Sequence, residues 1–174
     1  MSRFVFIDEM GSNLALSRLD GRAEPGVRVV DHLPSQRGEN VSTIGALALD
    51  GVRAAMSLPG AIDGEAFLFF VRFHLAPALL PGDIVILDNV PTHKVDGVEE
   101  AIEAVGAQVK YLPAYSPDFS PLEHFWSKVK TILRGIGARG PKELLAALKR
   151  AFAEVTLQDI LGWFQHCGYQ VASN

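Results

Sequence analysis

The order of the β-strand signals constrains the fold of this chain more than any other feature. Residues 41–49 and 52–58 each read as a strand, and Asp50-Gly51 between them is a strong two-residue hairpin signal, so the two strands are expected to be antiparallel. The run DIVIL at 83–87 is apolar and β-branched, as expected of a strand buried on both faces. Helical segments flank this run, and helical crossovers join parallel strands. The chain is therefore predicted to build a sheet of mixed direction.

Apolar runs, helical periodicity and capping residues predict the remaining elements. The further strands are expected at 3–8 and 108–112, with a short one at 27–30 inside a loop over 14–40. The helices are expected at 63–80 (with Asp63 as N-cap), 95–105, 121–134, 141–155 and 157–166. We therefore predict one α/β domain over 1–174, with a mixed five-stranded sheet and helices on both faces. This is the element order that a ribonuclease H-like fold requires.

Composition excludes several classes of protein. The single cysteine, Cys167, rules out an internal disulfide framework and a cysteine-built zinc site. The most apolar window, 66–80, is too short and too polar for a membrane span, so no membrane contact is expected. The net charge of −4 argues against a general nucleic-acid binder, but residues 128–150 carry seven basic side chains against one acid, Glu143. That stretch is either a solvated helical surface or a patch that faces phosphates.

Two acids directly follow apolar strand runs. Asp8 closes FVFID, and Asp88 closes DIVILD. Ligands of open α/β sheets bind in the crevice beyond the carboxyl ends of the strands. Each aspartate is thus either a site residue or a turn-former, because aspartate also favours strand exits.

A third acid, Glu123, falls in the first turn of the helix expected at 121–134. Ser120 and Glu123 match a capping box with Pro121 at the first helical position, and capping alone explains the glutamate. Capping does not explain the rigid segment from Pro113 to Pro121, which fixes the direction in which the helix begins. Clustered carboxylates repel one another, and a hard divalent cation removes that cost. Three acids on a strand, a strand and a helix start therefore suit two Mg²⁺ ions, with Mn²⁺ as a substitute.

The segments FIDE (6–9), ILDNVPTHK (86–94) and YLPAYSPDFSPLEHFWSKVK (111–130) carry a family resemblance. The chain resembles the catalytic domain of mariner-like DDE transposases, in particular the bacterial insertion-sequence branch, which shows the same spacing of 34 residues between Asp88 and Glu123. The resemblance implies a ribonuclease H-like fold and a DDE endonuclease that cleaves and transfers DNA strands with two metal ions. It assigns the catalytic and metal-binding roles to Asp8, Asp88 and Glu123.

The resemblance also points to residues around the acids. The expected DNA-binding or site-lining residues are Asn89, His93, Lys94, Lys128, Lys130 and Arg134. A structural role for His93 and a solvated helix face for the basic residues are the alternatives. Glu9 is expected to point away from Asp8, because side chains alternate along a strand. Asp118 reads as a turn residue, and it is the obvious substitute ligand.

The resemblance further implies partners that lie outside this sequence. Full transposases of this kind carry N-terminal helix-turn-helix modules that recognise the ends of the element. We expect that module to come from a missing N-terminal region or a separate reading frame. The expected partner is DNA, as transposon ends and target, the expected assembly is a homodimer, and the expected location is the bacterial cytoplasm at the nucleoid. Two alternatives stay open: a nuclease of the same fold without strand transfer, and a catalytically silent remnant that binds DNA or dimerises.

Overall fold

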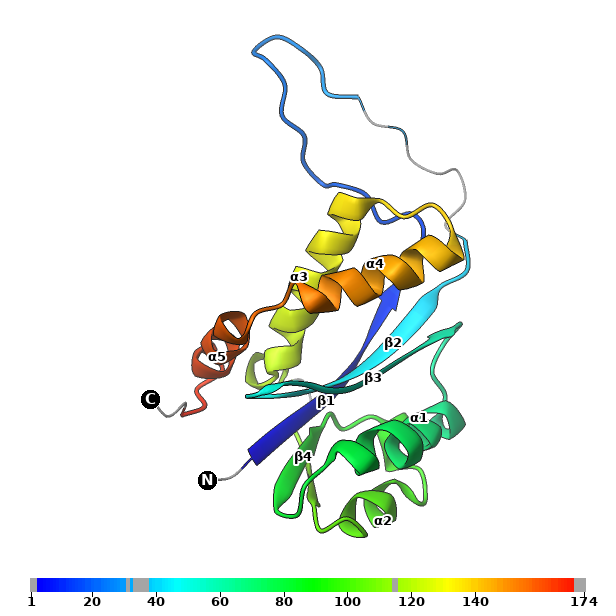
Figure 1. The fold of residues 1–174 in the computed structure, drawn as a ribbon, viewed down its shortest axis with the longest axis vertical. Helices are drawn as coiled ribbons and strands as arrows, with labels where there is room; N and C mark the ends of the chain where they lie inside the picture. The colour runs from blue at the N-terminus through cyan, green and yellow to red at the C-terminus, as the bar shows by residue number, and fades with distance from the viewer. Residues whose placement is uncertain (1–2, 31, 33–37, 114–115, 171–174) are drawn as a thin grey trace.

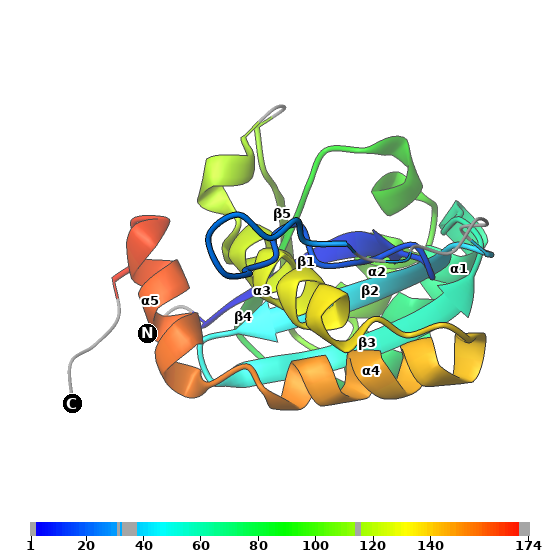
Figure 2. The same cartoon turned by 90° about the horizontal axis from the view of Figure 1, so that it is seen from above.

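A five-stranded sheet organises the molecule, which is described by a computed structural model for residues 3–30, 32, 38–113 and 116–170. The strands are β1 (Arg3–Ser12), β2 (Val41–Ala48), β3 (Gly51–Pro59), β4 (Asp83–Leu87) and β5 (Gln108–Tyr111). They lie in the order β3-β2-β1-β4-β5, with β3 and β5 at opposite edges (Figure 1 and Figure 2). Pairing is antiparallel among β1, β2 and β3 and parallel among β1, β4 and β5. The predicted mixed sheet is confirmed.

Helices cover both faces of the sheet and create two separate hydrophobic cores. α1 (Gly64–Phe70) and α2 (Val98–Glu103) lie on one face. The other face carries α3 (Pro121–Ile136), α4 (Pro141–Ala153) and α5 (Leu157–His166), as Figure 1 shows. Each helix presents its apolar stripe to the sheet, so the α/β sandwich follows from helical periodicity on both sides.

Side chains of β1 alternate between the two cores. Phe6 and Met10 pack beneath α3, α4 and α5, whereas Ile7 packs toward α1 and α2. By the same alternation Asp8 belongs to the α3 face of the sheet and Glu9 to the opposite face. The sequence expectation for Glu9 agrees with this arrangement.

The strand β1 is longer than predicted, and Asp8 does not close it. β1 continues to Ser12 because residues 5–12 pair with β2 in an antiparallel ladder, and this partner is invisible to the local apolar pattern. The parallel pairing of β1 with β4 stops earlier, where Phe6 lies opposite Ile86. Continuing that register by two residues brings Asp8 level with Asp88, just beyond the end of β4.

Three further elements differ from the sequence prediction. The single helix expected at 63–80 is divided into α1, a π-helical turn η1 (Val71–Leu75) and a 3-10 turn η2 (Ala76–Ala78). Pro77 has no N–H to donate and crowds the carbonyl four residues earlier, so an α-helical ladder cannot pass through it unchanged. Residues 27–30 form no strand, and α2 is shorter than the helix expected at 95–105.

A close contact with β2 positions α3 over the sheet. Gly45 lies opposite Asp8 in the ladder between β1 and β2. A Cβ atom at Gly45 would lie 2.7 Å from the Cη2 atom of Trp126, so the missing side chain makes room for the indole ring. Trp126 follows Glu123 by one helical turn. The first turn of α3 is therefore held near the level of Asp8.

Candidate active site

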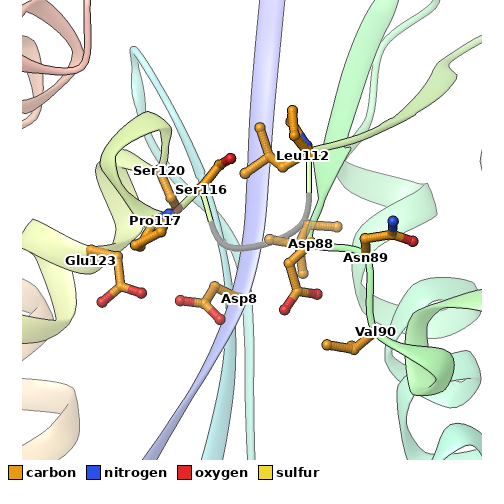
Figure 3. A pocket seen from close by; sticks show the side chains of 11 residues that line it. Asp8, Asp88, Asn89, Val90, Leu112, Ser116, Pro117, Ser120 and Glu123 are labelled. Atoms are coloured by element: carbon orange, nitrogen blue, oxygen red, sulfur yellow. The ribbon is translucent and has the colours of Figure 1, made fainter.

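Acids from three different elements line one open cleft. The cleft has a volume of about 380 Å³ and lies where β1, the end of β4 and the start of α3 meet. It is lined by Ile7, Asp8, Asp88, Asn89, Val90, Leu112, Pro113, Ser116, Pro117, Ser120 and Glu123. Figure 3 shows the carboxyl groups of Asp8, Asp88 and Glu123 directed into the same space, with Asp8 between the other two.

Asp8 is held in an environment that resists its ionisation. Burial raises the pKa of Asp8 to about 7; the backbone N–H of Glu9 works against this by donating to Oδ1 at 2.7 Å. The charges of Glu123, Asp88 and Glu9 contribute to this raised pKa. Desolvation and repulsion both disfavour the ionised form of an acid that is buried among other acids. A positive charge in the cleft would relieve both effects.

A buried histidine joins two acids from opposite faces of the sheet. Nε2 of His93 lies 3.1 Å from Oε1 of Glu9, and Nδ1 contacts Oδ1 of Asp88. The imidazole ring also stacks on Phe67 of α1, with 4.2 Å between ring centroids. Burial lowers the pKa of His93, but the hydrogen bonds with Asp88 and Glu9 outweigh it and raise the pKa to about 9. His93 is thus an imidazolium near neutral pH, and it fixes one oxygen of Asp88.

Glu123 enters the cleft instead of capping its helix. The side chain of Ser120 makes no capping hydrogen bond, so the predicted capping box between Ser120 and Glu123 is wrong. The backbone N–H of Glu123 bonds instead to the carbonyl oxygen of Ser120, at 3.2 Å. The exposed Glu123 side chain points into the space beside Asp8 (Figure 3). Local helix-start chemistry therefore does not account for this glutamate.

The sequence matches a known family over most of its length. Residues 3–143 match the family described as DDE superfamily endonuclease. This chain belongs to the DDE superfamily endonucleases. The predicted family is confirmed, while membership of a bacterial branch stays a prediction. No curated protein matches the sequence.

Solved structures of the Mos1 mariner transposase share the fold. The chain superposes on the Mos1 mariner paired-end complex with Mn with a TM-score of 0.75 and 19% sequence identity, covering 95% of this chain and 53% of that one. The Mos1 mariner paired-end complex with Mg gives a TM-score of 0.70 at 20% identity, and the isolated Mos1 catalytic domain gives 0.68 at 17%. This DDE chain spans about half the length of the paired-end transposase chains that it matches. The predicted ribonuclease H-like fold is confirmed.

In this DDE endonuclease, a residue near the C-terminal end of the chain holds the segment that leads into α3. A 3-10 turn, η4 (Pro117–Phe119), precedes α3. The hydroxyl of Tyr169 donates to the carbonyl oxygen of Phe119 at 2.8 Å, and the Tyr169 ring packs on Phe6 with centroids 5.1 Å apart. Tyr169 could not be predicted from the sequence, because no local pattern links it to a turn fifty residues earlier.

The predicted DNA-binding or site-lining residues fall into separate groups. Asn89 lines the cleft, whereas Lys94 lies over the ring of Tyr111, 5.1 Å from its centroid. Nζ of Lys128 lies 2.5 Å from Oδ2 of Asp159, so Lys128 ties α3 to α5.

Helical geometry separates Lys128 from the two basic residues that follow it. At about 100° per residue, Lys130 and Arg134 share the helix face of Glu123, and Lys128 does not. A DNA contact stays a prediction for each of these three basic residues.

The donor set of the cleft fits a hard divalent cation. The described lining offers carboxylate oxygens and no thiolate, which suits Mg²⁺ or Mn²⁺. The raised pKa of Asp8 shows that the protein alone does not offset the charge of its acids. Among the residues that the structure describes, no three His, Cys, Asp or Glu side chains stand close enough to enclose an ion unaided. An ion held here would keep water among its ligands, as Mg²⁺ usually does.

Among the residues that the structure describes, no helix is long and apolar enough to cross a membrane.

Proposed function

We propose that this chain is the catalytic domain of a DNA transposase, which cleaves DNA strands and transfers them to target DNA at the cleft of Asp8, Asp88 and Glu123. The observation that carries the proposal is the meeting of three carboxylates, one from each of β1, the end of β4 and the start of α3, in one open cleft. Membership of the DDE superfamily endonucleases supports this assignment.

The three acids are the groups that would hold divalent cations. Two Mg²⁺ ions, or Mn²⁺ in their place, would activate an attacking oxygen and stabilise a leaving oxygen on phosphorus. Asp8 must lose its proton to act as a ligand, and a bound cation would favour that loss by offsetting the burial and the neighbouring negative charges that raise its pKa to about 7. Asp88 is oriented by His93, which in turn is held by Glu9 and Phe67.

The remaining protein groups would position the DNA. Lys130 and Arg134 share the helix face of Glu123; Lys130 would contact a phosphate near the cleft, and Arg134 would contact DNA farther along α3. Asn89 lines the same cleft and would contact the substrate beside Asp88. A helix-turn-helix module outside this chain would recognise the transposon ends, and a homodimer in the bacterial cytoplasm would bring two ends together.

Substitution of Asp88 tests the proposal. Purified Asp88→Asn protein should bind DNA with unchanged affinity in EDTA, yet lose cleavage of a transposon-end duplex in Mg²⁺ by at least about 100-fold. Wild-type protein supplied with pre-cut ends should join them to a target plasmid. Cleavage without joining would identify the chain as a nuclease of the same fold. Absence of both activities in Mg²⁺ and Mn²⁺ would identify it as a silent remnant. Undiminished cleavage by the variant would show that Asp88 takes no part in the reaction.

A further inference from the structure

A second cavity, of about 220 Å³, lies at the other end of α3 from the candidate active site. Its lining joins the loop after β1 to the C-terminal end of α3. Figure 1 shows this loop passing that end of the helix. Its lining includes Ser17, Arg18, Arg134 and Arg139. Of the described residues that line it, three are arginines and none is acidic. We name these three arginines the arginine pocket.

Backbone carbonyl oxygens anchor two of the three guanidinium groups of the arginine pocket, those of Arg139 and Arg18. Nη1 of Arg139 donates to the carbonyl oxygen of Leu14 at 3.2 Å, and Nη2 of Arg18 donates to that of Gly135 at 3.5 Å. Within the described ranges, no carboxylate forms an ion pair with Arg18, Arg134 or Arg139. Each guanidinium has five N–H donors, so most of the donors are left for a ligand.

Capping of α3 does not account for this concentration of charge. The helix ends at Gly137, which has a φ of 64° and donates its N–H to the carbonyl oxygen of Leu133. One basic side chain in the last turn complements the helix dipole, and Arg134 supplies it. Arg139 binds the loop after β1 instead of the helix. Gathered guanidinium groups repel one another, and an anion with several acceptor oxygens relieves that repulsion.

The helix geometry relates the arginine pocket to the cleft. Arg134 follows Glu123 by eleven residues, which is about 16 Å along the axis and within about 20° of the same face. Lys130, seven residues after Glu123, lies on that face between them. A line of positive charge therefore leads from the cleft to the arginine pocket. About 16 Å corresponds to about five nucleotides of one strand of a duplex.

We propose that the arginine pocket binds a backbone phosphate of DNA, about five nucleotides from the phosphodiester that occupies the cleft. The inference rests on the proposed function, because it takes the cleft as the place where DNA reacts. Phosphate contacts carry no sequence information, but they fix the register of the duplex. The arginine pocket thus sets which phosphodiester reaches the three acids.

The test compares DNA binding by the full chain and by Arg18→Gln/Arg134→Gln, which leaves the loop anchor of Arg139 in place. Fluorescence anisotropy in EDTA, with a 20-base-pair duplex and increasing KCl, gives the Kd and its salt dependence. The variant should bind about tenfold more weakly at low salt, with a slope of log Kd against log[KCl] reduced by about 1, as one lost phosphate contact predicts. The control Lys149→Gln/Arg150→Gln removes the same charge from α4 and should retain the wild-type slope.

Several outcomes separate the pocket from a structural role. A lower melting temperature with an unchanged Kd and slope would overturn the proposal, as would a control variant equal to the pocket variant. A conservative variant, Arg134→Lys, should keep the slope. If inorganic phosphate up to 50 mM raises the melting temperature of wild type but the pocket variant binds DNA normally, the pocket takes free anions and the DNA assignment fails.

Cleavage assays distinguish failure of the pocket from failure of the proposed function. On a duplex that extends about ten base pairs on both sides of the cut, the pocket variant should cleave with a raised KM and shifted cut positions. On a duplex trimmed to three base pairs on each side, wild type and variant should behave alike, because the DNA cannot reach the pocket. If neither protein cleaves but the pocket variant still loses affinity and salt slope, the pocket stands and the proposed reaction falls.

Discussion

Replacing Asp8 with asparagine should stabilise the metal-free fold while removing its activity. Asparagine has nearly the shape of a protonated aspartic acid, and its Oδ1 can still accept the N–H of Glu9 that now bonds at 2.7 Å. It removes the negative charge that burial and the nearby acids Glu123 and Asp88 disfavour. The variant therefore keeps the contacts of the side chain and loses its electrostatic cost.

The size and sign of the effect follow from the pKa of Asp8. The folded-state pKa of about 7 lies above the ordinary value of 3.8, so Asp8 contributes stability that is complete below pH 3.8 and lost as the pH rises to about 7. At about 1.4 kcal/mol per tenfold change in the ionisation constant, the full loss is about 4 kcal/mol. Water and salt in the open cleft reduce this value, so we expect Asp8→Asn to gain about 2 kcal/mol over wild type at pH 8 and nothing at pH 4.

Urea denaturation in EDTA at pH 4, 6 and 8, followed by circular dichroism, measures this difference. The exposed Asp118, which does not line the cleft, provides the matched control, and Asp118→Asn should follow wild type at every pH. Adding 10 mM Mg²⁺ should stabilise wild type and leave Asp8→Asn unchanged, because binding to the folded state stabilises it by mass action. A variant as stable as wild type at pH 8, or a gain that is the same at pH 4 and pH 8, would refute the electrostatic account of Asp8.

Three further predictions concern the groups that support the cleft. Gly45→Ala places a methyl group against Trp126 and should cost about 1–3 kcal/mol in urea denaturation while lowering DNA cleavage by more than about tenfold, because α3 must shift; normal cleavage would contradict this. With a folded pKa of about 9, His93 contributes stability that is complete below pH 6.5 and lost as the pH rises through 9. The unfolding free energy of wild type should thus fall by about 3 kcal/mol relative to that of His93→Gln between pH 6.5 and pH 9. Parallel pH profiles of the two proteins would contradict this prediction. Lys128→Gln should lower stability by about 0.5–1 kcal/mol through loss of the pair with Asp159, with a DNA Kd within about twofold of a control that neutralises Lys149; a much larger loss of affinity would assign Lys128 to DNA.

Much of the fold could be read from the sequence, because the informative patterns are local. The hairpin, the buried run at 83–87 and the amphipathic helix at 121–134 each depend on residues that are neighbours in the chain, although the hairpin turns at Leu49-Asp50, one residue before the predicted Asp50-Gly51. The end of β1, which was predicted wrongly, depends on a distant partner. The last residues of β1 form a strand because β2 lies beside them. Among the described residues, no strand pairs with residues 27–30, which form none.

The sequence by itself determined that Asp8 and Asp88 follow apolar strand runs and that Glu123 lies at a helix start, and their spacing indicated the family. Only the tertiary structure decided what each side chain touches. His93 joins Glu9, 84 residues away, to Asp88, and Lys128 forms an ion pair with Asp159. Such pairings depend on sheet order and on the rotation of α3 about its axis, which are set by burial of two cores at once and not by any local pattern.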